Sequence, residues 1–147
     1  PGQQPDLAIH KFALRMLRGE PIPVYGDGSS RRDYTYIDDI VDGIVAAMKR
    51  AMTESSLTTG LYEVINLGNS HTVSLLEMIH ALEEVLGVEA TLEYLPPQPG
   101  DAPQTWADGE KAKALLGYEP LTVLHGGLEG FARWLDNRSD AGTGLSW

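Results

Sequence analysis

The chain has 147 residues and a formal net charge of −10, from 11 Lys and Arg against 21 Asp and Glu, and a protein this acidic is not expected to bind nucleic acid. It contains no cysteine, which excludes disulfides, thiolate metal sites and cysteine nucleophiles. No apolar run approaches the roughly 18 residues of a membrane span and no signal peptide is recognisable, so we expect a cytoplasmic protein with no membrane partner.

The first quarter of the chain predicts one helix and two short strands. Apolar residues at helical spacing indicate a helix from about Asp6 to Glu20, which Gly19 and the prolines after it would end. Residues 22–25 predict a short strand at the edge of a sheet, because proline cannot donate to a central ladder. Residues 26–30 predict a turn, and residues 31–36 alternate enough to predict a second short strand.

A long helix and a third strand are predicted next. Asp38 or Asp39 is expected to cap a helix whose apolar face extends to Met52. After a polar connector, residues 61–66 predict a strand. This helix and this strand are more apolar than so few predicted strands can cover. We therefore expect a missing partner, either another domain or a second copy of the chain.

The second half of the chain predicts further helices and one strand. Ser74 and Glu77 have the spacing of a capping box, and Gly87 would end the helix that they begin. A strand at residues 90–95 would complete a strand–helix–strand order with residues 61–66, which suggests a parallel βαβ unit. Two more helices are predicted, at Asp108–Gly117 and at about Val123–Asn137.

Motif spacing identifies no catalytic, cofactor-binding or metal-binding residue. Neither glycine-rich dinucleotide fingerprint occurs, the histidines lack metal-ligand spacing, and no tyrosine is followed by lysine four residues later. Asp38 and Asp39 are better explained as helix caps than as a metal or acid/base pair. Arg31 and Arg32 form a candidate anion clamp, with a pair of surface arginines as the alternative, and only one of them can point inward from a strand.

Four stretches of the sequence occur in an order that is typical of one protein family. They are Pro23–Gly28 (PVYGDG), Arg32–Ile40 (RDYTYIDDI), Tyr62–Gly68 (YEVINLG), and Leu95–Asp101 (LPPQPGD) followed by Thr105–Asp108 (TWAD). The series resembles the extended short-chain dehydrogenase/reductase family of NAD-dependent sugar-nucleotide epimerases, dehydratases and decarboxylases. The last stretch is similar to the epimerase branch, especially UDP-glucuronate and UDP-glucose 4-epimerases.

The resemblance implies that the chain is only the carboxyl-terminal half of a longer enzyme. Residues 1–137 would be a small α/β domain that binds UDP-sugar and lacks most of the Rossmann sheet, and residues 138–147 would be a flexible tail. The missing half would bind NAD and carry the catalytic tyrosine and lysine, so this chain alone would be inactive. The implied reaction is inversion at C4 of UDP-glucuronate or UDP-glucose through a 4-keto intermediate.

The resemblance also implies which residues bind the UDP-sugar. Val24 and Tyr25 would line the uracil, largely through backbone groups, and Arg32 would clamp the diphosphate. Asp101 would accept hydrogen bonds from ribose hydroxyls. Gln98 stands where galactose-type epimerases commonly carry arginine, and glutamine there is usual in the uronate branch.

Other interpretations stay open from the sequence. Many uronate epimerases carry arginine where Gln4 stands, so the sugar is undecided. The chain could instead be a stand-alone nucleotide-sugar binding module, or half of a UDP-glucuronate decarboxylase or dTDP-sugar dehydratase. A third interpretation is self-association of two copies through the surface that the missing half would leave uncovered.

Overall fold

The computed structural model describes residues 6–54 and 62–140, and the chain divides into two compact units. The first unit consists of Pro1–Ser30, Ser74–Asp101 and Leu124–Trp147, and the second of Arg31–Val73 and Ala102–Val123. Each unit is therefore assembled from segments that lie far apart in the sequence. The sequence analysis did not predict this division, because local patterns do not show which distant segments pack together. Gln4 lies outside the described residues.

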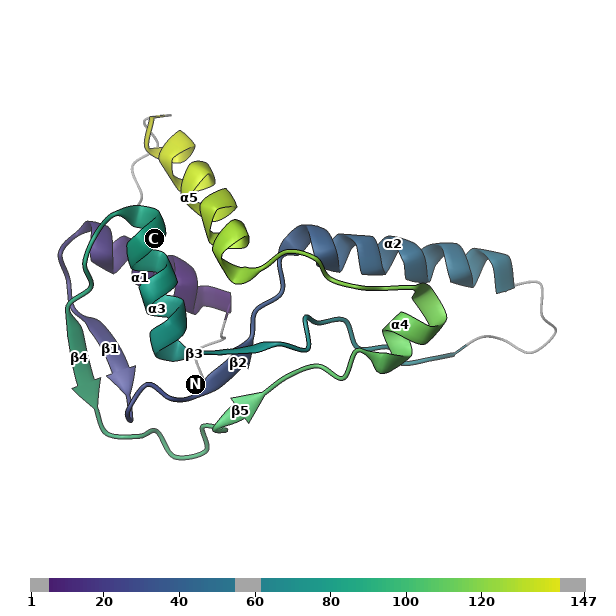
Figure 1. Ribbon diagram of the computed structural model, residues 1–147, viewed down its shortest axis with the longest axis horizontal. Coiled ribbons are helices and arrows are strands. Elements are labelled where there is room, and N and C mark those ends of the chain that lie inside the picture. Colours follow the sequence, from purple (N-terminus) through teal and green to yellow (C-terminus); the bar gives the residue numbers. More distant parts are fainter. Residues whose placement is uncertain (1–5, 55–61, 141–147) are drawn as a thin grey trace. The chain divides into compact units, whose positions relative to one another are not determined.

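The first unit contains a two-stranded parallel sheet (Figure 1). β1 (Ile22–Tyr25) pairs with β4 (Leu92–Leu95), and Pro23 lies opposite Glu93. The predicted edge strand at residues 22–25 is confirmed, since β1 has one strand neighbour in the part of the chain that is described. The predicted βαβ unit that joined residues 90–95 to an earlier strand at 61–66 is wrong, because β4 pairs with β1.

Three helices complete the first unit, namely α1 (Asp6–Leu17), α3 (Leu75–Leu86) and α5 (Leu124–Asp140). α1 contacts β1 and α3, and α3 packs against α5. The capping box predicted for α3 is confirmed, because Ser74 Oγ accepts the Glu77 N–H at 3.2 Å and Glu77 Oε2 accepts the Ser74 N–H at 2.7 Å. Each helix contributes buried apolar residues, and the core of the unit consists of Ala13, Met16, Ile22, Val24, Met78, Ile79, Leu82, Leu128 and Leu135.

The carboxyl end of α5 differs from the predicted one. The helix ends at Asp140, whereas the sequence predicts an end near Asn137 and a flexible tail from residue 138. Residues 138–140 are therefore helical, and the rest of the predicted tail, residues 141–147, lies outside the described residues.

The second unit contains a sheet with the strand order β3-β2-β5. β2 (Arg31–Asp33) pairs in parallel with β5 (Gln104–Thr105), and β3 covers Thr72–Ser74. Two helices, α2 (Ile37–Glu54) and α4 (Glu110–Leu116), pack against each other. The sequence analysis missed β3 and β5, because strands of three and two residues are too short to show an alternating pattern.

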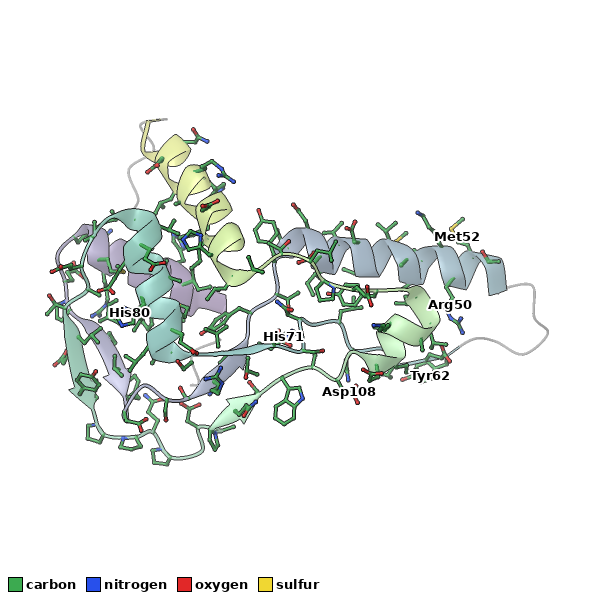
Figure 2. All side chains as sticks on the ribbon, viewed as in Figure 1. Arg50, Met52, Tyr62, His71, His80 and Asp108 are labelled. Carbon is green, nitrogen blue, oxygen red and sulfur yellow. The ribbon has the colours of Figure 1, made fainter. Side chains whose placement is uncertain are left out.

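The apolar face of α2 is exposed in the described part of the chain. It carries Val41, Ile44, Val45, Met48 and Met52, whose exposed fractions run from 39% to 77%; Met52 is labelled in Figure 2, close to the carboxyl end of the helix. The predicted strand at residues 61–66 is wrong for the five residues that are described, since residues 62–66 form no strand. A strand needs a neighbour to pair with, and the described residues provide none here.

Candidate functional site

The carboxyl ends of β1 and β4 meet in the first unit. Tyr25 lies opposite Leu95, and the Gly26 N–H donates to Leu95 O at 2.9 Å. The loop after β4 lies next to the turn after β1. A β-carbon placed on Gly26 would be 3.8 Å from Pro97 Cγ, which is ordinary van der Waals contact. Ligands of open α/β sheets bind beyond the carboxyl ends of parallel strands, at this kind of position.

The predicted binding residues of the first unit offer different groups to a ligand. The Val24 side chain is completely buried, which restricts any contact with a ligand to its backbone. Gln98 and Asp101 are exposed in the loop at residues 96–101, where the Asp101 N–H donates to Gln98 O at 3.2 Å and closes a turn. The fold therefore brings Tyr25 and this turn to the same end of the β1–β4 sheet.

The glycine-rich turn after β1 is a tight connection rather than a phosphate loop. Gly26 and Gly28 have φ angles of 73° and 78°, which glycine adopts without strain. Asp27 Oδ1 accepts hydrogen bonds from the Ser29 hydroxyl at 2.6 Å and from the Ser29 N–H at 2.9 Å, and these bonds lower the pKa of Asp27. A carboxylate held in this way would repel a phosphate.

The amino terminus of α3 does not fit a dinucleotide either. In dinucleotide-binding folds the free N–H groups of a helix start bind the phosphates. Here the first three N–H groups already have acceptors: Leu75 donates to Ser30 O (2.9 Å), Leu76 to Gly28 O (3.3 Å) and Glu77 to Ser74 Oγ (3.2 Å). Neither glycine-rich dinucleotide fingerprint occurs in the sequence, so the start of α3 lacks both features of a dinucleotide phosphate site.

The two adjacent arginines of the second unit have different partners. Arg31 is held by Thr72, to which its Nε donates at 3.1 Å (Oγ1) and its Nη2 at 2.6 Å (O). Arg32 Nη1 donates to Arg31 O at 2.8 Å and to Ala102 O at 2.9 Å, which fixes the direction of its guanidinium. Burial raises the pKa of Tyr34, and the positive charge of Arg32 opposes that rise. Both arginines therefore have hydrogen-bond acceptors within the second unit, and the role of Arg32 as an anion clamp stays a prediction.

Asp39 has a structural role that the sequence analysis missed. The prediction that Asp38 or Asp39 caps its own helix is wrong, because α2 already begins at Ile37. Instead the buried carboxylate of Asp39 accepts the Leu121 N–H at 3.2 Å and the Thr122 N–H at 3.1 Å. It thereby connects the first turn of α2 to the segment after α4. Two adjacent aspartates look the same in the sequence whether they cap a helix or bind a distant backbone segment.

Tyr118 should make the stability of the second unit fall at alkaline pH. Burial raises the pKa of its phenol above the ordinary 10.0, and the negative charges of Asp39 and Asp33 add to the effect. The folded state then holds the proton to higher pH than the unfolded state, so stability is lost as the pH rises above about 10. The Tyr118 hydroxyl is buried and has no hydrogen-bond partner among the described residues, so Tyr118→Phe should cost nothing at pH 7.

Urea unfolding of Tyr118→Phe at pH 7 and pH 10.5 checks this prediction. The variant should lose less stability between the two pH values than the wild type does. Tyr94→Phe is the control, since Tyr94 is 58% exposed. A Tyr118→Phe variant with the same alkaline loss as the wild type would contradict the prediction.

Comparison with known proteins gives a consistent result. The sequence profile of the NAD dependent epimerase/dehydratase family matches residues 1–68. A UDP-glucuronate 4-epimerase of Thermodesulfobacterium geofontis is 38% identical over 135 residues, which cover 91% of this chain and 39% of that protein. The crystal structure of UDP-glucuronic acid 4-epimerase from Bacillus cereus, in complex with UDP-glucuronic acid and NAD, matches 94% of this chain with a TM-score of 0.77 and 39% identity.

The chain is similar in sequence and in fold to NAD-dependent epimerases and dehydratases. The predicted resemblance to sugar-nucleotide epimerases of the extended short-chain dehydrogenase/reductase family and the predicted α/β fold are thereby confirmed. UDP-glucose 4-epimerase of Thermotoga maritima, solved with UDP-glucose, is a further structural relative, with a TM-score of 0.76 and 33% identity over 89% of this chain.

The chain spans about two fifths of the length of the relatives it matches. It covers 42% of the Bacillus cereus enzyme and 39% of an uncharacterized protein from Methanocaldococcus jannaschii that is 42% identical to it. Among the described residues no group of three or more acidic or histidine side chains is placed to hold a metal ion. None of the helices in those residues is long and apolar enough to cross a membrane.

Proposed function

We propose that this chain is the substrate-binding part of an NAD-dependent UDP-sugar 4-epimerase, which inverts C4 of UDP-glucuronate or UDP-glucose through a 4-keto intermediate. The observation that carries the proposal is the likeness to the Bacillus cereus epimerase, whose structure contains UDP-glucuronic acid and NAD. The position of Tyr25, Gln98 and Asp101 at the carboxyl end of a parallel strand pair supports it.

In this proposal the chain binds and orients the UDP-sugar. The backbone of Val24 and the residue Tyr25 line the uracil, and Asp101 accepts hydrogen bonds from the ribose hydroxyls. Arg32 donates to the diphosphate, for which the planar fork of a guanidinium is suited. Gln98 takes the place of the arginine of galactose-type enzymes and favours a uronate sugar. Holding the substrate in one orientation can account for a large part of a rate enhancement.

NAD and the catalytic tyrosine and lysine would belong to a part of the protein outside this chain. Two observations support this assignment: the chain covers 42% of the Bacillus cereus enzyme, and neither glycine-rich dinucleotide fingerprint occurs in its sequence. Residues 1–137 would then serve as one UDP-sugar binding domain that is inactive alone. The exposed apolar face of α2 would be covered by the NAD-binding part.

The decisive experiment examines the protein as its source cells make it. We expect a product about twice the mass of this chain, with bound NAD, that interconverts UDP-glucuronate or UDP-glucose with its C4 epimer. A full-length product that binds NAD and both UDP-sugars without turning either over would contradict the epimerase assignment.

Replacing Arg32 with alanine should weaken UDP binding by about 1.5–3 kcal/mol, the range for a lost hydrogen bond to a charged group. Isothermal titration of the purified chain with UDP measures the change. Arg18→Ala is the control for the loss of one positive charge, because Arg18 is an exposed residue just after α1. Equal affinities of Arg32→Ala and the wild type would remove Arg32 from the site.

The alternatives to an epimerase half are a stand-alone binding module, a self-associating chain, and half of a decarboxylase or dehydratase. A native product near 16 kDa would favour a stand-alone binding module, because motif spacing predicts no catalytic centre in this sequence. Self-association of two copies through the exposed face of α2 is favoured by the same uncovered surface, and light scattering of the purified chain would detect it. Turnover with release of carbon dioxide or water, in place of epimerisation, would indicate the decarboxylase or dehydratase branch.

A further inference from the structure

Asp33, the last residue of β2, accepts an unusual number of hydrogen bonds. Its Oδ1 accepts the Asn69 N–H at 3.0 Å and the Thr35 hydroxyl at 3.1 Å. Its Oδ2 accepts the Ser70 N–H at 3.1 Å and the Ala107 N–H at 3.2 Å. An ionised carboxylate has about four acceptor positions, so these four donors occupy them all. The group is therefore suited to holding backbone segments in place rather than to binding a ligand.

The segment that Asp33 holds at Ala107 also contacts Arg32. β2 and β5 share only two residue pairs, Arg31 with Gln104 and Arg32 with Thr105. Before these pairs the Arg31 N–H donates to Pro103 O at 2.8 Å, and after them Asp33 binds the Ala107 N–H. A ladder of two pairs is weak alone, so these two hydrogen bonds at its ends fix its register.

The direction of the Arg32 guanidinium depends on that register. One acceptor of Arg32 Nη1 is Ala102 O at 2.9 Å, which lies on the same segment as β5 and Ala107. If the Asp33–Ala107 contact were lost, the segment could shift along β2 and carry Ala102 O away from the guanidinium. Asp33 thus acts on Arg32 through the backbone of residues 102–107.

We propose that Asp33 is the positioning residue that holds Arg32 in the orientation that binds the diphosphate of the UDP-sugar. This inference rests on the proposed function, because it takes Arg32 as the diphosphate ligand. Simple electrostatics predicts the opposite effect of a mutation at this position. Removing the negative charge of Asp33 beside a diphosphate should tighten binding, whereas the loss of a positioning residue should weaken it.

The test compares UDP with uridine, which lacks the diphosphate, by ligand-observed NMR titration of the purified chain. Asp33→Asn replaces one carboxylate oxygen with an N–H₂ group that cannot accept from the backbone. We expect it to weaken UDP binding about tenfold and to leave uridine binding within twofold of the wild type. General damage to the fold would weaken both ligands equally and would overturn the proposal, as would unchanged or tighter UDP binding.

Three further variants make the result decisive. Asp42→Asn, at an exposed position of α2, removes the same charge and should leave both affinities unchanged. Asp33→Glu keeps the charge but displaces the carboxylate by one methylene, and it should show the same selective loss; if Asp33→Asn does not fold, wild-type UDP affinity of Asp33→Glu overturns the proposal. Arg32→Ala must itself lose UDP selectively. If Arg32→Ala binds UDP as the wild type does, Arg32 is not the diphosphate ligand and the proposed function loses this site. If Arg32→Ala loses UDP selectively but the Asp33 variants do not, only the role of Asp33 is rejected.

Discussion

Asp39→Ala is expected to lower the free energy of unfolding of the second unit by about 3 kcal/mol. Asp39 is 9% exposed, and its carboxylate accepts two backbone N–H groups, from Leu121 and Thr122. A hydrogen bond to a charged group contributes about 1.5–3 kcal/mol, and the substitution removes two of them. The segment after α4 should then detach from α2 before the rest of the unit unfolds.

Asp38→Ala is a closely matched control for this prediction. Asp38 and Asp39 both lie in the first turn of α2, so each loses the same favourable interaction with the helix dipole, about 0.3–1 kcal/mol. Asp38 is exposed, so its replacement should cost no more than that amount. Urea unfolding gives both values, and hydrogen exchange at Leu121 and Thr122 shows whether the loss is local. Equal destabilisation by the two variants would mean that the hydrogen bonds of Asp39 contribute little.

The same pair of aspartates shows what local sequence can predict and what it cannot. An acidic pair at the start of an apolar stretch predicts the helix correctly, because the interaction of acidic side chains with the helix dipole is a local effect. Which of the two carboxylates is buried depends on Leu121 and Thr122, more than eighty residues later in the chain. The helix was therefore predictable and the role of Asp39 was not.

The pairing of the strands could not be predicted from the sequence for a similar reason. The strands at residues 22–25 and within 90–95 were found from their own composition, but their parallel pairing joins segments seventy residues apart. Residues 62–66 have the composition of a strand and form none, because the described residues supply no neighbour for them. Propensity describes what a segment can become, and the available partner decides the outcome.

The binding residues show the contribution of family resemblance. Motif spacing alone reached only the Arg31–Arg32 pair and left it undecided. Both arginines have acceptors in the second unit, Arg31 at Thr72 and Arg32 at the Arg31 and Ala102 carbonyls, so the choice of Arg32 also comes from the resemblance. Tyr25, Gln98 and Asp101 carry no recognisable spacing and came from the resemblance. The structure places them at one end of a sheet, and their contact with a ligand stays a prediction.

Gly68→Ala is expected to destabilise the second unit by about 3 kcal/mol, the upper part of the usual range for an overpacked site. A β-carbon at residue 68 would lie only 2.4 Å from the Ala107 β-carbon and 2.8 Å from Asp33 Oδ2. The first of these atoms is attached directly to the backbone and cannot rotate away. The second belongs to the carboxylate that accepts the Ser70 and Ala107 N–H groups, so relieving one contact would break the other hydrogen bonds.

A second substitution that removes the opposing atom tests this explanation. Ala107→Gly alone should cost about 0.5–1 kcal/mol through added freedom of the unfolded chain. In the Gly68→Ala background it should instead restore stability, because the 2.4 Å contact disappears. Urea unfolding of the four proteins gives the coupling energy, and simple addition of the two losses would contradict the packing argument. Restoration would explain the glycine of the Asn66-Leu67-Gly68 motif physically: any side chain there would separate the segments that Asp33 holds together.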